Sequence, residues 1–152
     1  MTDSTIGDTD FPTPAAIIEV HDTIEDEYDI KYTGARVAAP RLELREILED
    51  VNEFDGVYFR AAALLRGLIT AHIFEDGNKR TARAVTVLYL EEHNLKPADR
   101  DETVERVLRR IGRFDMLELA EWLETGDIDE ELRARVRRVI DEERELFDAL
   151  DT

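Results

Sequence analysis

Residues whose types and spacing could carry out chemistry are concentrated in one segment, residues 72–83, with the sequence His-Ile-Phe-Glu-Asp-Gly-Asn-Lys-Arg-Thr-Ala-Arg. Gly77 predicts a sharp turn, because glycine adopts backbone conformations that a β-carbon penalises. A helix is expected to begin directly after this turn, and the free backbone N–H groups of its first turn would favour an anion. Arg80 and Arg83 are three residues apart, so both guanidinium groups could contact one ligand. Two such groups beside a helix N-terminus are typical of a polyphosphate site.

Two further residues of the segment could act on a bound phosphate. Asp76 precedes the turn, where its carboxylate could hold Mg²⁺ between phosphate oxygens. His72 lies one turn further back, and an imidazole can accept the proton of an attacking hydroxyl near neutral pH. His72 and Asp76 also have the i, i+4 spacing of a metal pair, but Gly77 interrupts the helix, which disfavours a structural zinc site. The segment therefore favours a transfer reaction of the phosphoryl type.

The same segment resembles the signature of the Fic/Doc (Fido) family, His-x-Phe-x-(Asp/Glu)-Gly-Asn-(Gly/Lys)-Arg-x-x-Arg, at every specified position. The resemblance implies that His72 is the general base, that Phe74 anchors the loop in the core and that Asp76 binds Mg²⁺. It also implies a set of residues that shape the loop and hold the nucleotide phosphates: Gly77, Asn78, Lys79, Arg80 and Arg83. A flap near residues 30–38, with Tyr32, Thr33 and Gly34, would dock an extended segment of the target protein by strand addition.

Lys79 stands where the family divides between two reactions. Members that transfer AMP usually have Gly at this position, whereas members that resemble the Doc toxin have Lys and transfer the γ-phosphoryl group of ATP. The run from Asn78 to Ala82 is Doc-like, but Arg83 is typical of AMP-transferring members. The Gly-Gly-rich flap turn of Doc relatives is also replaced by residues 32–36. We therefore expect a Doc-like kinase, with AMP transfer to a Ser, Thr or Tyr hydroxyl as the alternative and a catalytically silent Fic-fold binding module as a third possibility.

The resemblance also implies cofactors and partners. It implies ATP and Mg²⁺, a target protein that is a translation elongation factor, and membership of a toxin–antitoxin pair of the death-on-curing type. Relatives that restrain themselves carry a (Ser/Thr)-x-x-x-Glu-(Gly/Asn) helix. The run Thr23-Ile-Glu-Asp-Glu27 departs from that pattern at Tyr28. An antitoxin protein acting in trans is therefore expected.

The elements that must position these residues are predicted to be helices. Thr13-Pro14 is typical of a helix cap with proline in the first turn, and Asp99–Glu102 and Asp115–Glu118 have capping-box spacing. Helices are expected over residues 14–28, 40–51, 57–73, 78–93, from 99, 115–126 and 129–150. The fourth is apolar nearly all round, which predicts that it is the central buried helix. The fold class expected is all-α, a Fic/Doc (Fido) bundle of six to seven helices with a small β-hairpin flap, or a loop, over residues 29–38.

The chain is predicted to have three parts. Residues 1–12 form an acidic, disordered N-terminus, and residues 13–126 form the Fic/Doc domain. Residues 127–152 contain a charged helix that packs on the domain or on a partner. Its apolar stripe could fold back on the core, form a homodimer seam or dock another protein.

Composition limits the environment and the partners. The 152 residues include 37 Asp or Glu and 20 Lys or Arg, which gives a net charge of −17, and 17 of the cations are Arg. This bias resembles proteins of salt-loving archaea, in which salt screens the self-repulsion. The negative charge argues against direct binding to nucleic acid or to anionic membranes. The absence of cysteine, of an N-terminal signal sequence and of long apolar stretches predicts a soluble, cytoplasmic protein.

Overall fold

The structure, a computed structural model, describes residues 6–7, 9–98, 102–128 and 131–150 of the chain. Within these ranges the regular elements are helices, and the all-α fold class is confirmed. The elements are α1 (Pro14–Tyr28), α2 (Pro40–Val51), α3 (Val57–Ala71), α4 (Asn78–Glu92), α5 (Glu102–Arg109), the 3-10 turn η1 (Ile111–Arg113), α6 (Met116–Thr125), α7 (Glu131–Glu142) and α8 (Arg144–Ala149). Eight α-helices are present in the described ranges rather than six or seven, because the last predicted helix is divided at Glu143.

Local capping signals begin the helices where the sequence predicts them. The Thr13 hydroxyl accepts a hydrogen bond of 3.1 Å from the backbone N–H of Ala16, and Pro14 is the first residue of α1. Asp115 and Glu118 form a complete capping box at α6, with reciprocal bonds of 2.7 and 3.1 Å. The predicted cap at Asp99 lies outside the described residues.

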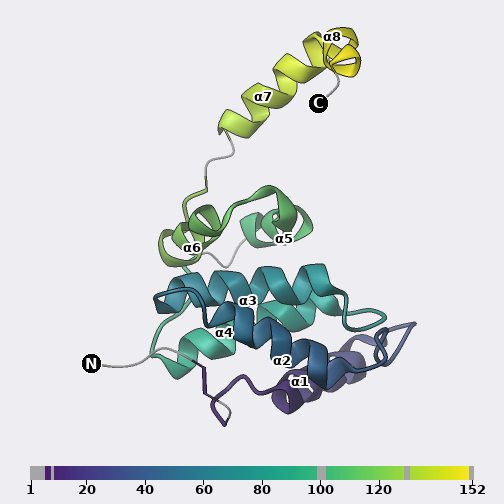
Figure 1. Ribbon diagram of the computed structural model, residues 1–152, viewed down its shortest axis with the longest axis vertical. Coiled ribbons are helices and arrows are strands. Elements are labelled where there is room, and N and C mark those ends of the chain that lie inside the picture. Colours follow the sequence, from purple (N-terminus) through teal and green to yellow (C-terminus); the bar gives the residue numbers. More distant parts are fainter. Residues whose placement is uncertain (1–5, 8, 99–101, 129–130, 151–152) are drawn as a thin grey trace.

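The central helix is α3, which packs against α2, α4 and α6 (Figure 1). Ala61 and Ala62 have no exposed surface, so neighbouring helices approach the α3 backbone closely. The prediction that residues 78–93 form the central helix is wrong, because α4 leaves Leu88 40% exposed and lines a cavity with residues of its first three turns. The apolar residues of α4 cover one side of the core rather than its centre.

The flap between α1 and α2 is a loop, and the predicted β-hairpin is not present among the described residues. A single antiparallel bridge joins Ala35 to Phe74. The backbone N–H of Arg36 donates to the carbonyl of Ile73 (2.8 Å), and that of Glu75 donates to the carbonyl of Gly34 (3.1 Å). The flap therefore pairs with the 72–83 segment instead of with itself.

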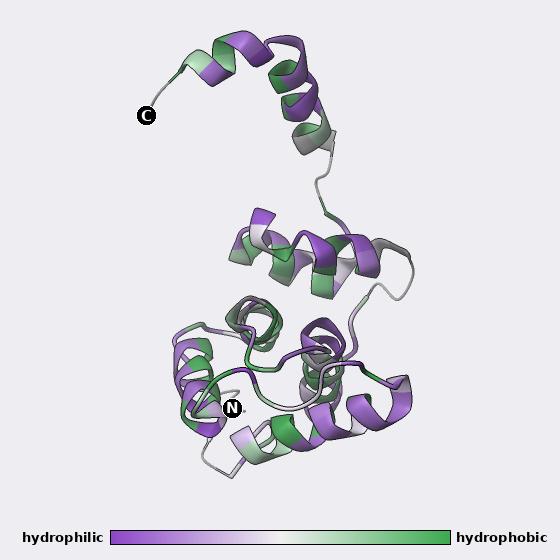
Figure 2. Cartoon of the chain, turned by 90° about the vertical axis from the view of Figure 1, so that its right-hand side faces the viewer, coloured by the Kyte–Doolittle hydropathy of each residue, from purple (hydrophilic) through white to green (hydrophobic). Residues whose placement is uncertain are grey.

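The two ends of the described chain differ in how they contact the other helices. The side-chain amide of Asn52 bonds to the backbone N–H and C=O of Ile6 at 2.8 and 2.7 Å, and Ile6 is buried in the core. The expected disorder of residues 1–12 therefore does not extend to Ile6. At the other end, α7 and α8 extend away from the other helices (Figures 1 and 2). Within the described ranges, no helix combines the length and the apolar character that crossing a membrane requires.

Candidate functional site

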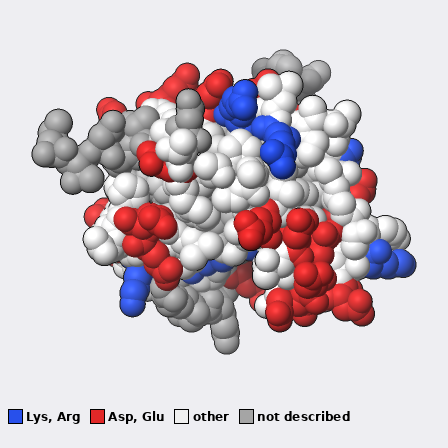
Figure 3. Space-filling model, turned by 90° about the horizontal axis from the view of Figure 1, so that it is seen from below, with Lys and Arg blue, Asp and Glu red and all other residues white. Residues whose placement is uncertain are grey.

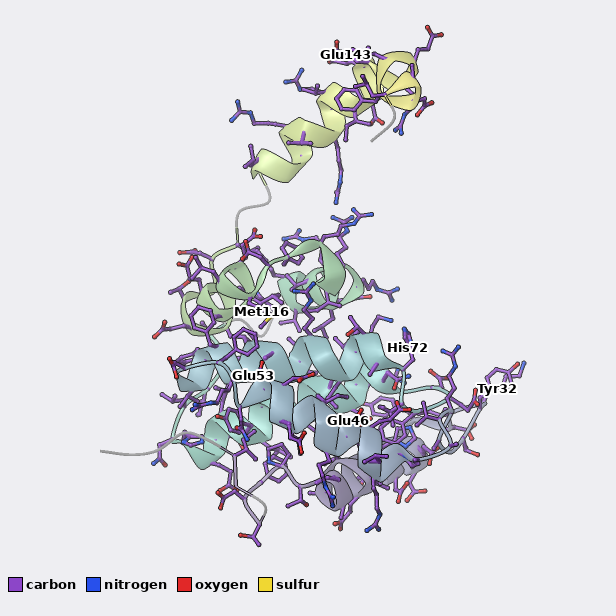
Figure 4. All side chains as sticks on the ribbon, in the orientation of Figure 1. Tyr32, Glu46, Glu53, His72, Met116 and Glu143 are labelled. Atoms are coloured by element: carbon purple, nitrogen blue, oxygen red, sulfur yellow. The ribbon has the colours of Figure 1, made fainter. Side chains whose placement is uncertain are left out.

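The 72–83 segment connects α3 to α4, and α3 ends two residues earlier than predicted. His72 is the C-cap of α3, with a left-handed backbone conformation (φ 48°, ψ 52°). The prediction that the helix continues to Ile73 is therefore wrong. Because the chain turns at His72, the imidazole is exposed at the end of α3 instead of packed in the core (Figure 4). An exposed imidazole can meet a group carried by another protein.

Asn78, the first residue of α4, holds the loop closed. Its side-chain oxygen accepts from the backbone N–H of Phe74 (3.2 Å), and its side-chain nitrogen donates to the Phe74 carbonyl (2.9 Å). Phe74 is 4% exposed, which is the core position expected for an anchor. Gly77 has φ +79°, and a β-carbon there would lie 2.9 Å from Cδ1 of Ile30. The turn thus needs glycine both for its backbone conformation and for space.

A histidine of α1 supports the other side of this loop. Nε2 of His21 lies 2.8 Å from the backbone carbonyl of Asp76. Because a carbonyl only accepts, Nε2 carries the proton. The His21 ring also stacks on Phe74, with 3.7 Å between centroids and 6° between planes. The sequence predicts a packed, hydrogen-bonded histidine here, and its 1% exposure confirms this, but its partners come from a segment 55 residues away.

Glu25, one turn after His21, connects the same helix to the flap. Its Oε1 lies 3.8 Å from Nδ1 of His21, and its Oε2 accepts from the backbone N–H of Gly34 at 2.7 Å. His21, Asp22 and Glu25 also place possible metal-ligand atoms within 4.8 Å of one another. One atom of His21 (Nε2) already contacts Asp76, and one atom of Glu25 (Oε2) already contacts Gly34. We therefore assign His21 and Glu25 a supporting position behind the loop.

A cavity of about 1080 Å³ brings most of the predicted site residues together. It is lined from the 72–83 segment by His72, Glu75, Asp76, Gly77, Asn78, Lys79, Arg80 and Arg83. Phe74 lies behind the loop in the core, and Tyr32, Thr33 and Gly34 are exposed in the flap outside the cavity. Figure 4 shows His72 at the end of α3 and Tyr32 further out. The structure thus separates the site into a cavity, an anchor and a flap.

The opposite wall of the cavity comes from α5, which sequence reasoning did not include. Val104 and Leu108 provide apolar surface, and Glu105 and Arg109 form an ion pair of 3.0 Å at its edge. The amphipathic period of residues 102–109 indicates a helix with one covered face, but it does not say what that face covers. Only the tertiary arrangement shows that α5 closes the cavity.

Two contacts already position charged groups of the site. The Arg80 guanidinium lies 4.0 Å from the centre of the Tyr28 ring, in a cation–π contact. One carboxylate oxygen of Asp76 accepts from the backbone N–H of Gly77 at 2.7 Å, and the structure gives the other oxygen no protein partner among the described residues. This leaves Asp76 one oxygen with which to contact a cation.

The charge of the cavity differs from that of the chain. Its lining holds four cations (Lys79, Arg80, Arg83, Arg109) and three acids (Glu75, Asp76, Glu105). Elsewhere acids predominate, and the face shown in Figure 3 carries clusters of Asp and Glu with few Lys or Arg. A polyanion in this cavity would therefore meet a small excess of positive charge.

The helical fold thus places an exposed histidine, an aspartate and the cationic N-terminus of α4 around one cavity. Comparison with known families matches residues 11–90, which are 80 of the 152 residues, to the Fic/DOC family, and the chain belongs to that family. The family generally transfers nucleotide-derived groups to proteins, which indicates Fic-type transferase activity. No protein of curated function matches the chain significantly.

Proposed function

We propose that the protein is a Doc-like kinase that transfers the γ-phosphoryl group of ATP to a Thr or Ser hydroxyl of a target protein. The observation that carries this proposal is Lys79 in the first turn of α4, in the same cavity as His72. An ammonium group at a helix N-terminus can contact terminal phosphate oxygens, together with the guanidinium groups of Arg80 and Arg83. Gly at this position would leave bare backbone instead.

The residues present fit a magnesium ion with the nucleotide. Asp76 lines the cavity and has one carboxylate oxygen without a protein partner among the described residues, and a hard oxygen ligand of this kind suits Mg²⁺. When bound, Mg²⁺ would neutralise phosphate charge. Asn78 keeps the backbone N–H groups of the loop in place, and Gly77 lets the backbone approach the phosphates closely.

His72 would act as the general base. A ring nitrogen of His72 accepts the proton of the target hydroxyl while its oxygen forms a bond to the γ-phosphorus. The bond between the γ-phosphorus and the β–γ bridging oxygen breaks, and ADP leaves with that oxygen. The exposed position of His72 supports this role, because the acceptor hydroxyl belongs to another protein.

The flap would dock the target by strand addition. The bonds of Gly34 and Arg36 to the 72–83 segment leave the N–H and C=O of Ala35 directed away from it, because these groups alternate along an extended chain. Tyr32 and Thr33 are exposed next to this edge. An extended target segment paired with Ala35 would lie beside the loop that carries His72.

The reaction is tested with ATP labelled separately at the α and γ phosphates, using a cell lysate with the purified protein. We expect label from the γ position on a protein, and a translation elongation factor as the labelled protein by mass spectrometry. Label from the α position would overturn the kinase proposal in favour of AMP transfer. Lys79→Ala should reduce labelling strongly, whereas Lys96→Ala, a matched lysine outside the cavity, should not.

As a toxin, the protein would act in the cytoplasm, in a salt-loving organism, and would be restrained by an antitoxin in trans. Expression of the wild type should arrest growth, and His72→Ala should not. If His72→Ala were equally toxic, the chain would instead act as a catalytically silent binding module. A short reading frame directly beside the gene would support the antitoxin.

A further inference from the structure

Residues 131–150, here called the arm, carry an apolar stripe that the rest of the described chain leaves open to solvent. Leu132 is 55% exposed, Val136 48% and Leu150 63%. Leu146 is also exposed, and none of the residues of α8 is buried. Figure 2 shows hydrophobic positions along both helices of the arm, well away from the other helices. An exposed apolar stripe of this length indicates an interaction surface.

The spacing of the stripe is that of a two-helix seam. Positions 132, 136, 139, 143, 146 and 150 alternate in steps of four and three, as the inward positions of a coiled coil do. Five of the six are Leu or Val, and Glu143 is the charged one. Glu143 is also the residue between α7 and α8, with a non-helical backbone (φ −117°, ψ 35°). In the single chain the stripe is therefore interrupted at its one charged position.

The charges of the arm are divided along its length. Residues 131–138 contain four Arg and one Glu, a balance of +3, whereas residues 139–150 contain one Arg and five acids, a balance of −4. Two arms in parallel would place like charges opposite each other. Two antiparallel arms would place each basic half on an acidic half.

We propose that two copies of this chain associate through their arms as an antiparallel helix pair. This pairing requires α7 and α8 to continue as one helix through Glu143. In the register that aligns the two stripes, Leu132 faces Leu150 of the second copy, Val136 faces its Leu146 and Val139 faces its Glu143. The family match ends at residue 90, so the arm is a feature of this chain outside the matched region. The seam is short, and we therefore expect a dimer that depends on concentration rather than an obligate one.

Sedimentation velocity on the full chain, over a range of concentrations, tests the proposal. We expect reversible dimerisation that Val136→Asp weakens about a hundredfold, because a symmetric dimer carries the change twice. Val136 is half exposed, so the substitution should leave the circular dichroism of the domain unchanged. The matched control is Leu117→Asp on α6, which also alters an exposed apolar residue (53%) and should leave the dimer intact.

Single cysteines test the orientation, since the chain has none of its own. Mixed under mild oxidation, Val136→Cys and Leu146→Cys should form a disulfide heterodimer, while each variant alone should crosslink poorly. Crosslinking of each variant with itself would indicate parallel arms and overturn the proposal. A chain that stays monomeric at all concentrations, or a dimer that survives Val136→Asp, would overturn it as well.

Discussion

His21→Phe tests whether α1 holds the loop that bears Asp76. Phenylalanine keeps an aromatic ring against Phe74, so the stack of 3.7 Å can persist. The substitution removes the 2.8 Å hydrogen bond to the Asp76 carbonyl and the Nδ1 group that faces Glu25. The perturbation is therefore confined to polar contacts behind the loop.

The expected magnitude follows from this one bond. Leaving a partly buried carbonyl without its donor costs about 1–2 kcal/mol, so the free energy of unfolding should fall by that amount. A domain with ordinary stability stays folded after such a loss. The transfer rate should fall further, about tenfold to a hundredfold, because a small displacement of Asp76 and its neighbours disturbs the alignment of the reacting groups. The loss of activity would thus exceed what unfolding explains.

Three measurements on the full chain decide the matter. Chemical denaturation gives the free energy of unfolding, and label transfer from ATP gives the transfer rate. Amide hydrogen exchange reports how often the hydrogen bonds of the Arg36 and Glu75 N–H groups open, and these bonds join the flap to the loop. We expect faster exchange at both amides in His21→Phe. His93→Phe is the matched control, because His93 packs edge-on against Tyr89 and lies outside the cavity. Wild-type stability, exchange and transfer in His21→Phe would refute the reasoning.

Three substitutions separate the loop from the general stability of the fold. Gly77→Ala forces a β-carbon into a left-handed conformation and against Ile30. It should lower the free energy of unfolding by about 2 kcal/mol and abolish transfer. An active, stable variant would show that the turn tolerates a side chain. Asn78→Ala removes both hydrogen bonds to Phe74, so it should lower the free energy of unfolding by about 1–3 kcal/mol and speed amide exchange at Phe74. Unchanged exchange at Phe74 would contradict the role assigned to Asn78. Asp115→Ala breaks the capping box of α6 and should lower the free energy of unfolding by about 1 kcal/mol, while the transfer rate stays unchanged. A loss of transfer would contradict the inference that this cap stabilises the fold without affecting the site.

The sequence predicts those parts of the fold that depend on interactions between residues close together in the chain. Thr13-Pro14 and Asp115–Glu118 cap helices through bonds that span three residues, and the spacing alone reveals them. The glycine turn of the 72–83 segment and the helix that follows it are of the same kind. These signals place Gly77 and the first turn of α4 correctly.

The parts that the sequence does not predict depend on contacts between distant segments. The apolar spacing of residues 57–73 continues through Ile73, but the chain leaves the helix at His72 because its next residues pair with the flap. The sequence favours a hairpin for the flap, yet its backbone pairs with Ile73 and Glu75, and Gly34 also donates to the Glu25 side chain. The central position of α3 and the closure of the cavity by α5 are likewise tertiary outcomes. Apolar periodicity predicts which face of a helix is buried, but it does not predict which element packs against that face.

The charge of the chain and the charge of the cavity act over different distances. A net charge of −17 repels a nucleotide at long range, and salt weakens that repulsion because exposed charges further apart than a Debye length are screened. A phosphate at hydrogen-bond distance from Lys79, Arg80 and Arg83 would be much closer than that length, so salt would weaken this attraction less than the long-range repulsion. An acidic surface is therefore compatible with nucleotide binding in that solvent. We therefore expect the small excess of cations around the N-terminus of α4, rather than the sign of the whole surface, to determine where a phosphate group is held.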